Sequence, residues 1–143
     1  MTETDSHNAI SALIHRYAEL IDTGDLAGVG ELFEDATYRS DRGGLYRGAA
    51  AVRDVLQSKV RLYDGIPRTK HVTTNVVIEV DETNDAATSR SYYTVLQATD
   101  GLSLQPIIAG RYHDRFTRVG STWRFSDRLV FIDLVGDLSQ HLR

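Results

Sequence analysis

The stretch His71-Val72-Thr73-Thr74-Asn75-Val76-Val77-Ile78 lies where the periodicity of the chain changes from helical to extended. Upstream of it, apolar residues recur every three or four positions, whereas downstream they alternate with polar residues. The run is rich in β-branched side chains, which pack well on a pleated sheet. It therefore predicts a strand over residues 70–80, at the start of a strand-rich second half.

Further strands follow in this second half. Alternating segments predict them over residues 88–98, 104–118 and 122–134, with polar turns between them. Pro106 and Gly110 are positions at which the segment 104–118 can bend. Strands that follow one another through short turns pair in antiparallel fashion, so we predict a curved antiparallel sheet.

The spacing of apolar residues in the first half of the chain predicts three helices. The first ends near Thr23-Gly24, and Asp25 can cap the second. A short strand around Tyr38 and a glycine turn at Gly48 precede the third helix. The apolar face of the first helix is formed by Ile10, Leu13, Ile14, Tyr17, Ala18 and Ile21. Helices followed by long strands indicate an α+β domain in which the sheet closes over the helices.

The composition fits a single domain, residues 1–143, with 41% hydrophobic and 25% charged residues. The formal charge is −4 and the basic residues are scattered among acidic ones, which argues against a nucleic-acid partner. No apolar segment approaches the roughly eighteen residues that span a bilayer, and the N-terminal segment is acidic. We therefore expect a soluble, cytoplasmic protein without a membrane partner.

Several kinds of site have no support in the sequence. The chain has no cysteine, which excludes disulfides, thiolate nucleophiles and Cys-ligated metals. Its five histidines lack the H-x-x-x-H and H-E-x-x-H spacings, so a metal site would need long-range assembly. Neither a phosphate-binding loop nor a G-x-S-x-G nucleophile elbow is present.

His71 can serve as an acid–base centre, because imidazole titrates near neutral pH. A lone histidine at the head of a strand is more often structural, so this role depends on a carboxylate and a cavity. Asp22 lies at the edge of the first helix's apolar face, near the negative end of the helix dipole. An exposed turn residue is the simpler interpretation of Asp22. If the two residues meet, the carboxylate would orient the imidazole and stabilise its protonated form.

Period-2 alternation sorts the side chains of the last two strands. In residues 110–118 it places Tyr112 and Asp114 on an aromatic face and His113 on a solvated one. Asp114 there fits a buried structural acid at least as well as a catalytic one. In residues 122–134 the same rule directs Arg128 toward solvent, unless a β-bulge changes its direction.

The last strand also predicts association of the chain with copies of itself. Val130, Ile132 and Leu134 are expected to point outward from an open curved sheet. In a monomer they would leave apolar surface uncovered, which typically marks an interface. We therefore expect a homo-oligomer, with dimer and trimer both open.

The order and spacing of short motifs resemble the SnoaL-like branch of the nuclear-transport-factor-2-like superfamily. These motifs are residues 17–22, 32–36, 44–48, 71–75, 110–114 and 123–125. The resemblance implies a cone-shaped, cystatin-like fold, in which a curved antiparallel sheet and three N-terminal helices enclose an apolar pocket. Within this branch the chain is similar to scytalone dehydratase, bile-acid dehydratase and hexachlorocyclohexane dehydrochlorinase, whose Asp–His pair performs eliminations without a metal or organic cofactor.

The resemblance also implies roles for individual residues. Asp22 and His71 match the catalytic dyad, and Tyr38 and Tyr17 match active-site tyrosines. A phenol in an apolar cavity donates a hydrogen bond without burying a charge. The dehydrochlorinase has a lysine at the position of Tyr17, which argues against dehydrohalogenation. The second pocket histidine of scytalone dehydratase has no counterpart in residues 91–94. The residues expected to bind substrate are Asn75, Tyr92, Tyr112, Arg128 and Phe131.

The implied function is that of a cofactor-independent lyase or isomerase. In this hypothesis the dyad removes a proton from a small hydrophobic hydroxy-carbonyl substrate and eliminates water. Two alternatives stay open at this point: a non-catalytic small-molecule-binding module of the same fold, and an enzyme similar to polyketide cyclases. It is also open whether residues 136–143 close the pocket or pack on a neighbour.

Overall fold

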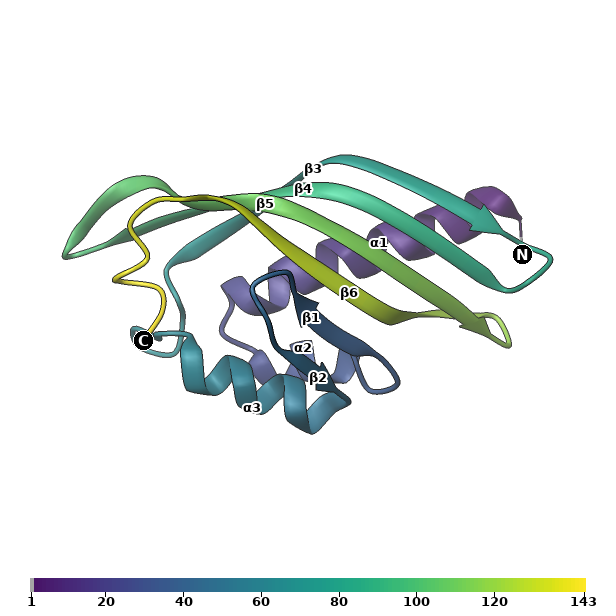
Figure 1. Ribbon diagram of the computed structural model, residues 1–143, viewed down its shortest axis with the longest axis horizontal. Coiled ribbons are helices and arrows are strands. Elements are labelled where there is room, and N and C mark those ends of the chain that lie inside the picture. Colours follow the sequence, from purple (N-terminus) through teal and green to yellow (C-terminus); the bar gives the residue numbers. More distant parts are fainter. Residues whose placement is uncertain (1) are drawn as a thin grey trace.

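The computed structural model describes residues 2–143, and four long strands arch over the three helices (Figure 1). None of the helices in this range is both long and apolar enough to cross a membrane. Each predicted long strand is present, with ends within two residues of the prediction. In chain order the elements are α1 (Glu3–Asp22), α2 (Leu26–Leu32), β1 (Thr37–Ser40), β2 (Leu45–Arg47), α3 (Ala49–Lys59), β3 (Thr69–Asp81), β4 (Ala86–Thr99), β5 (Leu102–Val119) and β6 (Thr122–Val135).

The strands form one six-stranded sheet in the order β2-β1-β6-β5-β4-β3. The long strands β3 to β6 pair with their neighbours in antiparallel fashion, as predicted. β1 pairs with β6 in parallel, on the side of β6 away from β5, which makes the sheet mixed. The predicted class, a curved sheet packed on three N-terminal helices, is confirmed.

The pairing of β5 with its two neighbours is irregular at two places, and both lie beside the predicted bend positions Pro106 and Gly110. The β4–β5 register skips Ile107 next to Pro106, and the β5–β6 register skips Asp133 opposite Gly110. A Cβ atom on Gly110 would lie 1.9 Å from the carbonyl oxygen of Phe131. Only glycine allows this close approach, which brings β6 over the bend in β5.

A β-bulge in β6 reverses the direction of the side chains that follow it. Arg115 pairs with Asp127 and Phe116 pairs with Phe125, so Ser126 is an extra residue in the ladder. Because side chains alternate, one extra residue directs Arg128 inward, and its side chain is fully buried.

The same bulge corrects the expectation for the end of the strand. Val130 and Ile132 also turn inward and line a cavity, so the prediction that they point outward is wrong. Leu134, beyond the second irregularity of the ladder, is 69% exposed as expected. Association of copies through the outer face stays a prediction.

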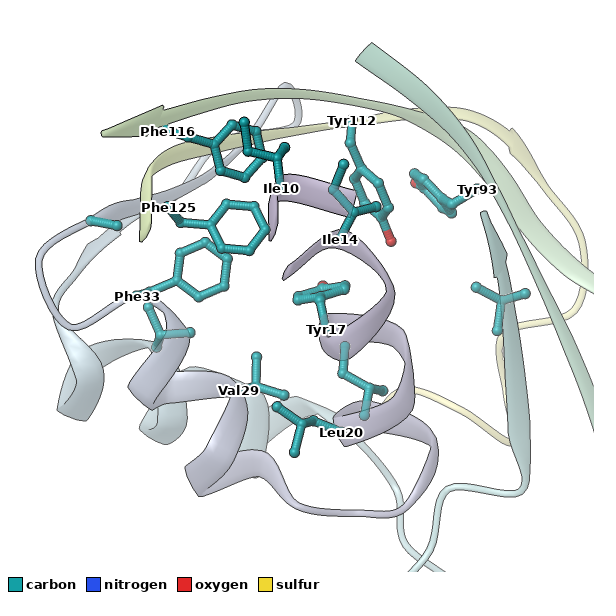
Figure 2. Close-up of a cluster of buried hydrophobic side chains, with 14 of the residues drawn as sticks. Ile10, Ile14, Tyr17, Leu20, Val29, Phe33, Tyr93, Tyr112, Phe116 and Phe125 are labelled. Carbon is teal, nitrogen blue, oxygen red and sulfur yellow. The ribbon is translucent and has the colours of Figure 1, made fainter. Parts of the chain in front are cut away.

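The core lies between helices α1 and α2 and the concave face of the sheet, and it includes Leu20, Val29 and Phe116 (Figure 2). Ile10 and Ile14 of α1 are buried there, and Phe33 stacks on Phe125 with ring centres 4.9 Å apart. Burial of each such side chain contributes about 1.5–3 kcal/mol. Beside the C-terminal turns of α1, the concave face also borders a cavity, which Tyr17 and Ile21 line.

Candidate active site

A cavity of about 320 Å³ lies between the C-terminal turns of α1, helix α3 and the concave face of the sheet. Its volume is near the lower end of the range for small-molecule sites, about 300–1,000 Å³. The apolar wall includes Ile21, Val95, Ile108 and Ile132. The polar groups on its surface include Tyr17, Tyr38, His71, Tyr93, Tyr112 and His141.

A second hollow, of about 350 Å³, lies between strands β3 to β6 and β1 on the outer face of the sheet. Charged side chains such as Glu79, Arg90 and Arg115 surround it. It lacks the apolar walls and converging hydrogen-bond donors that small-molecule sites typically have. The concave cavity is therefore the candidate site.

Asp22 and His71 meet beside the concave cavity, which the His71 ring lines and Asp22 does not. Asp22 is the last residue of α1, and its Oδ1 lies 2.6 Å from Nδ1 of His71 in β3. The Thr69 hydroxyl donates to the same oxygen at 2.8 Å, and the His71 backbone N–H donates to Oδ2 at 2.8 Å. Both side chains of the pair are about nine-tenths buried. These three donors compensate a carboxylate that would otherwise face the negative end of the helix.

The surroundings of Asp22 keep it ionised. Burial by itself raises the pKa of this carboxyl, but hydrogen bonds from His71 and Thr69 outweigh burial and lower the pKa below its ordinary value. An ionised carboxylate only accepts hydrogen bonds, so the neutral His71 ring carries its proton on Nδ1. The basic nitrogen is then Nε2, which makes no hydrogen bond with residues 2–143.

Tyrosine hydroxyl groups form a second polar cluster in the cavity. The hydroxyls of Tyr17 in α1 and Tyr38 in β1 lie 2.7 Å apart. Burial raises the pKa of both phenols well above the ordinary value, so they stay neutral hydrogen-bond donors. Tyr112 stacks on Tyr93 with ring centres 4.5 Å apart, and Tyr93 donates to the Phe131 carbonyl oxygen. Since one phenol of the first pair donates to the other, one O–H remains for a ligand.

Arg128 lies behind this cluster and does not line the cavity. Its guanidinium donates to Asp114 through Nε at 2.8 Å and Nη2 at 2.9 Å. The rings of Tyr17 and Tyr112 cover it, at 4.2 and 3.7 Å from the guanidinium carbon. The expectation that Arg128 contacts a substrate is therefore wrong. The arginine stabilises the positions of the tyrosines by cation–π contact, and Asp114 is its buried partner.

The SnoaL-like domain model matches residues 2–129 of the sequence. The chain belongs to the SnoaL-like domain family. No curated protein matches it. The Mycobacterium tuberculosis protein Rv3472, whose function is unknown, is 31% identical over 94% of this chain and 78% of its own, with a TM-score of 0.75.

Two more distant structures share the fold of this SnoaL-like chain. A candidate scytalone dehydratase from Novosphingobium aromaticivorans is 22% identical, with a TM-score of 0.75, over 96% of this chain and 91% of its own. LinA is 21% identical, with a TM-score of 0.73, over 95% of this chain and 91% of its own. Related structures are described as NTF2-like with a cystatin-like fold, which confirms the predicted family and fold.

Three residues expected to bind substrate lie outside the cavity of this SnoaL-like chain. Tyr92 is on the outer face of the sheet and 53% exposed, because it precedes the inward Tyr93. Phe131 faces outward between Val130 and Ile132, where the Arg111 guanidinium lies 4.1 Å from its ring centre. Asn75 is exposed. It sits at a register irregularity of β3 with a φ of 54°. The expectation that these three side chains line the pocket is wrong, whereas Tyr112 does line it.

The C-terminal tail, residues 136–143, brings an unexpected histidine to the cavity. His141 is 8% exposed, and its ring centre lies 6.4 Å from that of His71. His141 and Leu142 of the tail line this side of the cavity, and the tail is hydrogen-bonded to the end of α3 and the segment that follows it. Sequence reasoning missed His141 because the tail has no periodic pattern that would place its side chains. Among residues 2–143, no three histidine or carboxylate side chains gather as a possible metal site.

Proposed function

We propose that this SnoaL-like protein is a cofactor-independent lyase that eliminates water from a small hydrophobic β-hydroxy carbonyl compound. The observation that carries the proposal is the 2.6 Å contact of Asp22 and His71 beside an apolar cavity. A base, its orienting carboxylate and neutral donors for a developing oxyanion are the parts that proton abstraction next to a carbonyl requires. The volume of about 320 Å³ favours a substrate of one or two rings over a polycyclic one.

The first step forms an enolate. Nε2 of neutral His71 takes the proton from the carbon next to the carbonyl, and the C–H electron pair becomes the carbon–carbon double bond of the enolate. The carbonyl electrons move to oxygen, where the Tyr17 and Tyr38 pair donates a hydrogen bond. Asp22 stabilises the imidazolium that forms, because its carboxylate accepts the Nδ1 proton at short range.

The second step expels water. The enolate electrons return to re-form the carbonyl and displace the β-hydroxyl group, while the imidazolium of His71 delivers its proton to the departing oxygen. The products are water and an α,β-unsaturated carbonyl compound, and His71 is neutral again. Since one nitrogen takes and returns the proton, the hydrogen and the hydroxyl leave from the same face.

A suitable test substrate is the cyclic β-hydroxy ketone 3-hydroxy-1-tetralone, whose dehydration yields 1-naphthol after tautomerisation. We expect the protein to accelerate naphthol formation. We also expect Asp22→Asn and His71→Gln to lose about 10²–10⁴-fold in kcat, which is the usual size of general acid–base catalysis. The matched control is His113→Gln, since His113 lies on the outer face against Phe131 and should keep full activity.

Two outcomes would count against the proposal. Equal turnover by the wild type and both dyad variants would remove the dyad from the mechanism. Binding of cyclic β-hydroxy ketones without any turnover would favour a small-molecule-binding module of the same fold.

A further inference from the structure

The imidazole of His141 is a buried polar group without a protein partner. The residue is 8% exposed, and its Nδ1 is buried without a hydrogen-bond partner among residues 2–143. The ring also lines the candidate cavity. Most buried polar groups in proteins are hydrogen-bonded, so an unpaired nitrogen in a ring that lines a cavity calls for an explanation.

Packing of the tail does not require this ring to be polar, because backbone groups hold the tail. The Arg61 N–H donates to the His141 carbonyl oxygen at 2.8 Å, and the Arg143 N–H donates to that of Lys59 at 2.9 Å. Tyr63 donates to the Gln140 carbonyl oxygen at 2.6 Å. An apolar ring would leave these bonds intact and would remove an unpaired polar atom.

The charge state of His141 limits what its ring can do. Burial, with a smaller contribution from nearby His71, lowers its pKa to about 4, and Asp22 opposes this only weakly. At neutral pH the ring is therefore uncharged and is a poor source of protons. It can still donate one hydrogen bond and accept another. A neutral neighbour also avoids repelling the imidazolium that His71 forms in the proposed reaction.

We propose that His141 binds the β-hydroxyl group of the substrate beside His71, so that the C-terminal tail completes the site. The identity of that hydroxyl rests on the proposed dehydration. The ring centres of the two histidines lie 6.4 Å apart and both rings line the same cavity, so a ligand oxygen beside them can lie about 2.8 Å from a nitrogen of each ring. The carbonyl oxygen of the same molecule then reaches the Tyr17 and Tyr38 pair. His141 thereby selects ligands that carry a second oxygen.

Two unreactive probes isolate this contact. The naphthols 1,3-dihydroxynaphthalene and 1-naphthol differ only in the hydroxyl group on C3, which corresponds to the β-hydroxyl group of 3-hydroxy-1-tetralone. By isothermal titration we expect the wild type to bind the dihydroxy compound about tenfold more tightly. His141→Phe should bind both probes equally, because its ring fills the space without a hydrogen-bonding group. His141→Gln, which restores a neutral donor, should recover part of the preference.

A purely structural His141 predicts a different pattern. If His141→Phe keeps the wild-type preference, or if the wild type has none, the proposal is overturned. Thermal unfolding serves as the folding control, and we expect the midpoint of His141→Phe to equal or exceed that of the wild type. Since binding of these probes needs no turnover, the preference can hold while the dehydration assay fails, and the assay can succeed while the preference is absent.

Discussion

Two buried acid–base pairs lie close together in this protein and differ in what covers them. Asp22 and His71 are in contact at 2.6 Å, and Asp114 and Arg128 at 2.8 Å. His71 of the first pair lines the cavity, whereas Tyr17, Tyr112 and Phe125 enclose the guanidinium of the second pair. Proton transfer needs an acid–base group that can reach a ligand, and of the two pairs only the first presents such a group, the His71 ring, to the cavity.

The charge of Arg128 is permanent. Burial alone would lower its pKa, but Asp114 raises the pKa above the ordinary value of arginine. The pair therefore holds the tyrosines in place, while the proposed dyad exchanges protons beside them. Tyr17 joins the two regions, because its ring covers Arg128 and its hydroxyl contacts Tyr38.

The largest effect on stability is expected from breaking the enclosed pair. Arg128→Leu leaves the Asp114 carboxylate buried without a positive partner. We expect it to lower the free energy of unfolding by about 3–5 kcal/mol, measured by chemical denaturation. The double variant Arg128→Leu with Asp114→Leu removes both charges and should recover much of the loss. A single variant as stable as the wild type would show that the pair is dispensable.

A smaller effect, on kcat, is expected from the Tyr17 and Tyr38 pair, which lines the cavity and contacts Arg128 through the Tyr17 ring. Tyr38→Phe removes one hydroxyl of the Tyr17 and Tyr38 pair but keeps the ring and its packing. We expect kcat for 3-hydroxy-1-tetralone to fall by about a hundredfold, because one donor to the enolate is lost. Tyr46→Phe is the control, since Tyr46 lines the same cavity without a hydrogen bond to residues 2–143. Equal kcat values for the two variants would exclude Tyr38 from the mechanism.

The smallest expected effect is the pH dependence of stability that arises from His141, which lines the cavity. The unfolded chain protonates His141 near pH 6.5, whereas the folded chain does so only near its pKa of about 4. Stability is therefore complete above pH 6.5 and falls as the pH drops toward 4. Between pH 7 and 5 we expect His141 to cost about 2 kcal/mol of unfolding free energy.

Other groups near His141 also enter this measurement. His71 and Asp22 are the titratable groups that face it, so the contribution of His141 is the difference between the wild type and His141→Phe. The lowered pKa of Asp22 affects stability only below about pH 4, outside this window. Parallel pH profiles for the two proteins would contradict the assignment.

Local patterns in the sequence account for much of the fold. The change from helical to alternating periodicity places the three helices and the four long strands, and Pro106 and Gly110 mark the bends. The edge position of Asp22 and the strand position of His71 are local properties as well. Their contact, however, depends on how α1 crosses the sheet, and only the family resemblance predicted it.

The errors have one physical source each. Ser126 adds one residue to the β6 ladder, which turns Arg128, Val130 and Ile132 inward and Phe131 outward. A bulge depends on the pairing of two strands, so alternation within one strand does not reveal it. His141 was missed because long-range backbone contacts, and no local pattern, hold the tail.

The most direct test of the central claim is a double-mutant cycle on kcat/KM for 3-hydroxy-1-tetralone with Asp22→Asn, His71→Gln and the combined variant. If the two residues act as one unit, the combined variant should lose no more activity than the more damaging single substitution. Losses that multiply in the combined variant would contradict the dyad and show that Asp22 and His71 act independently.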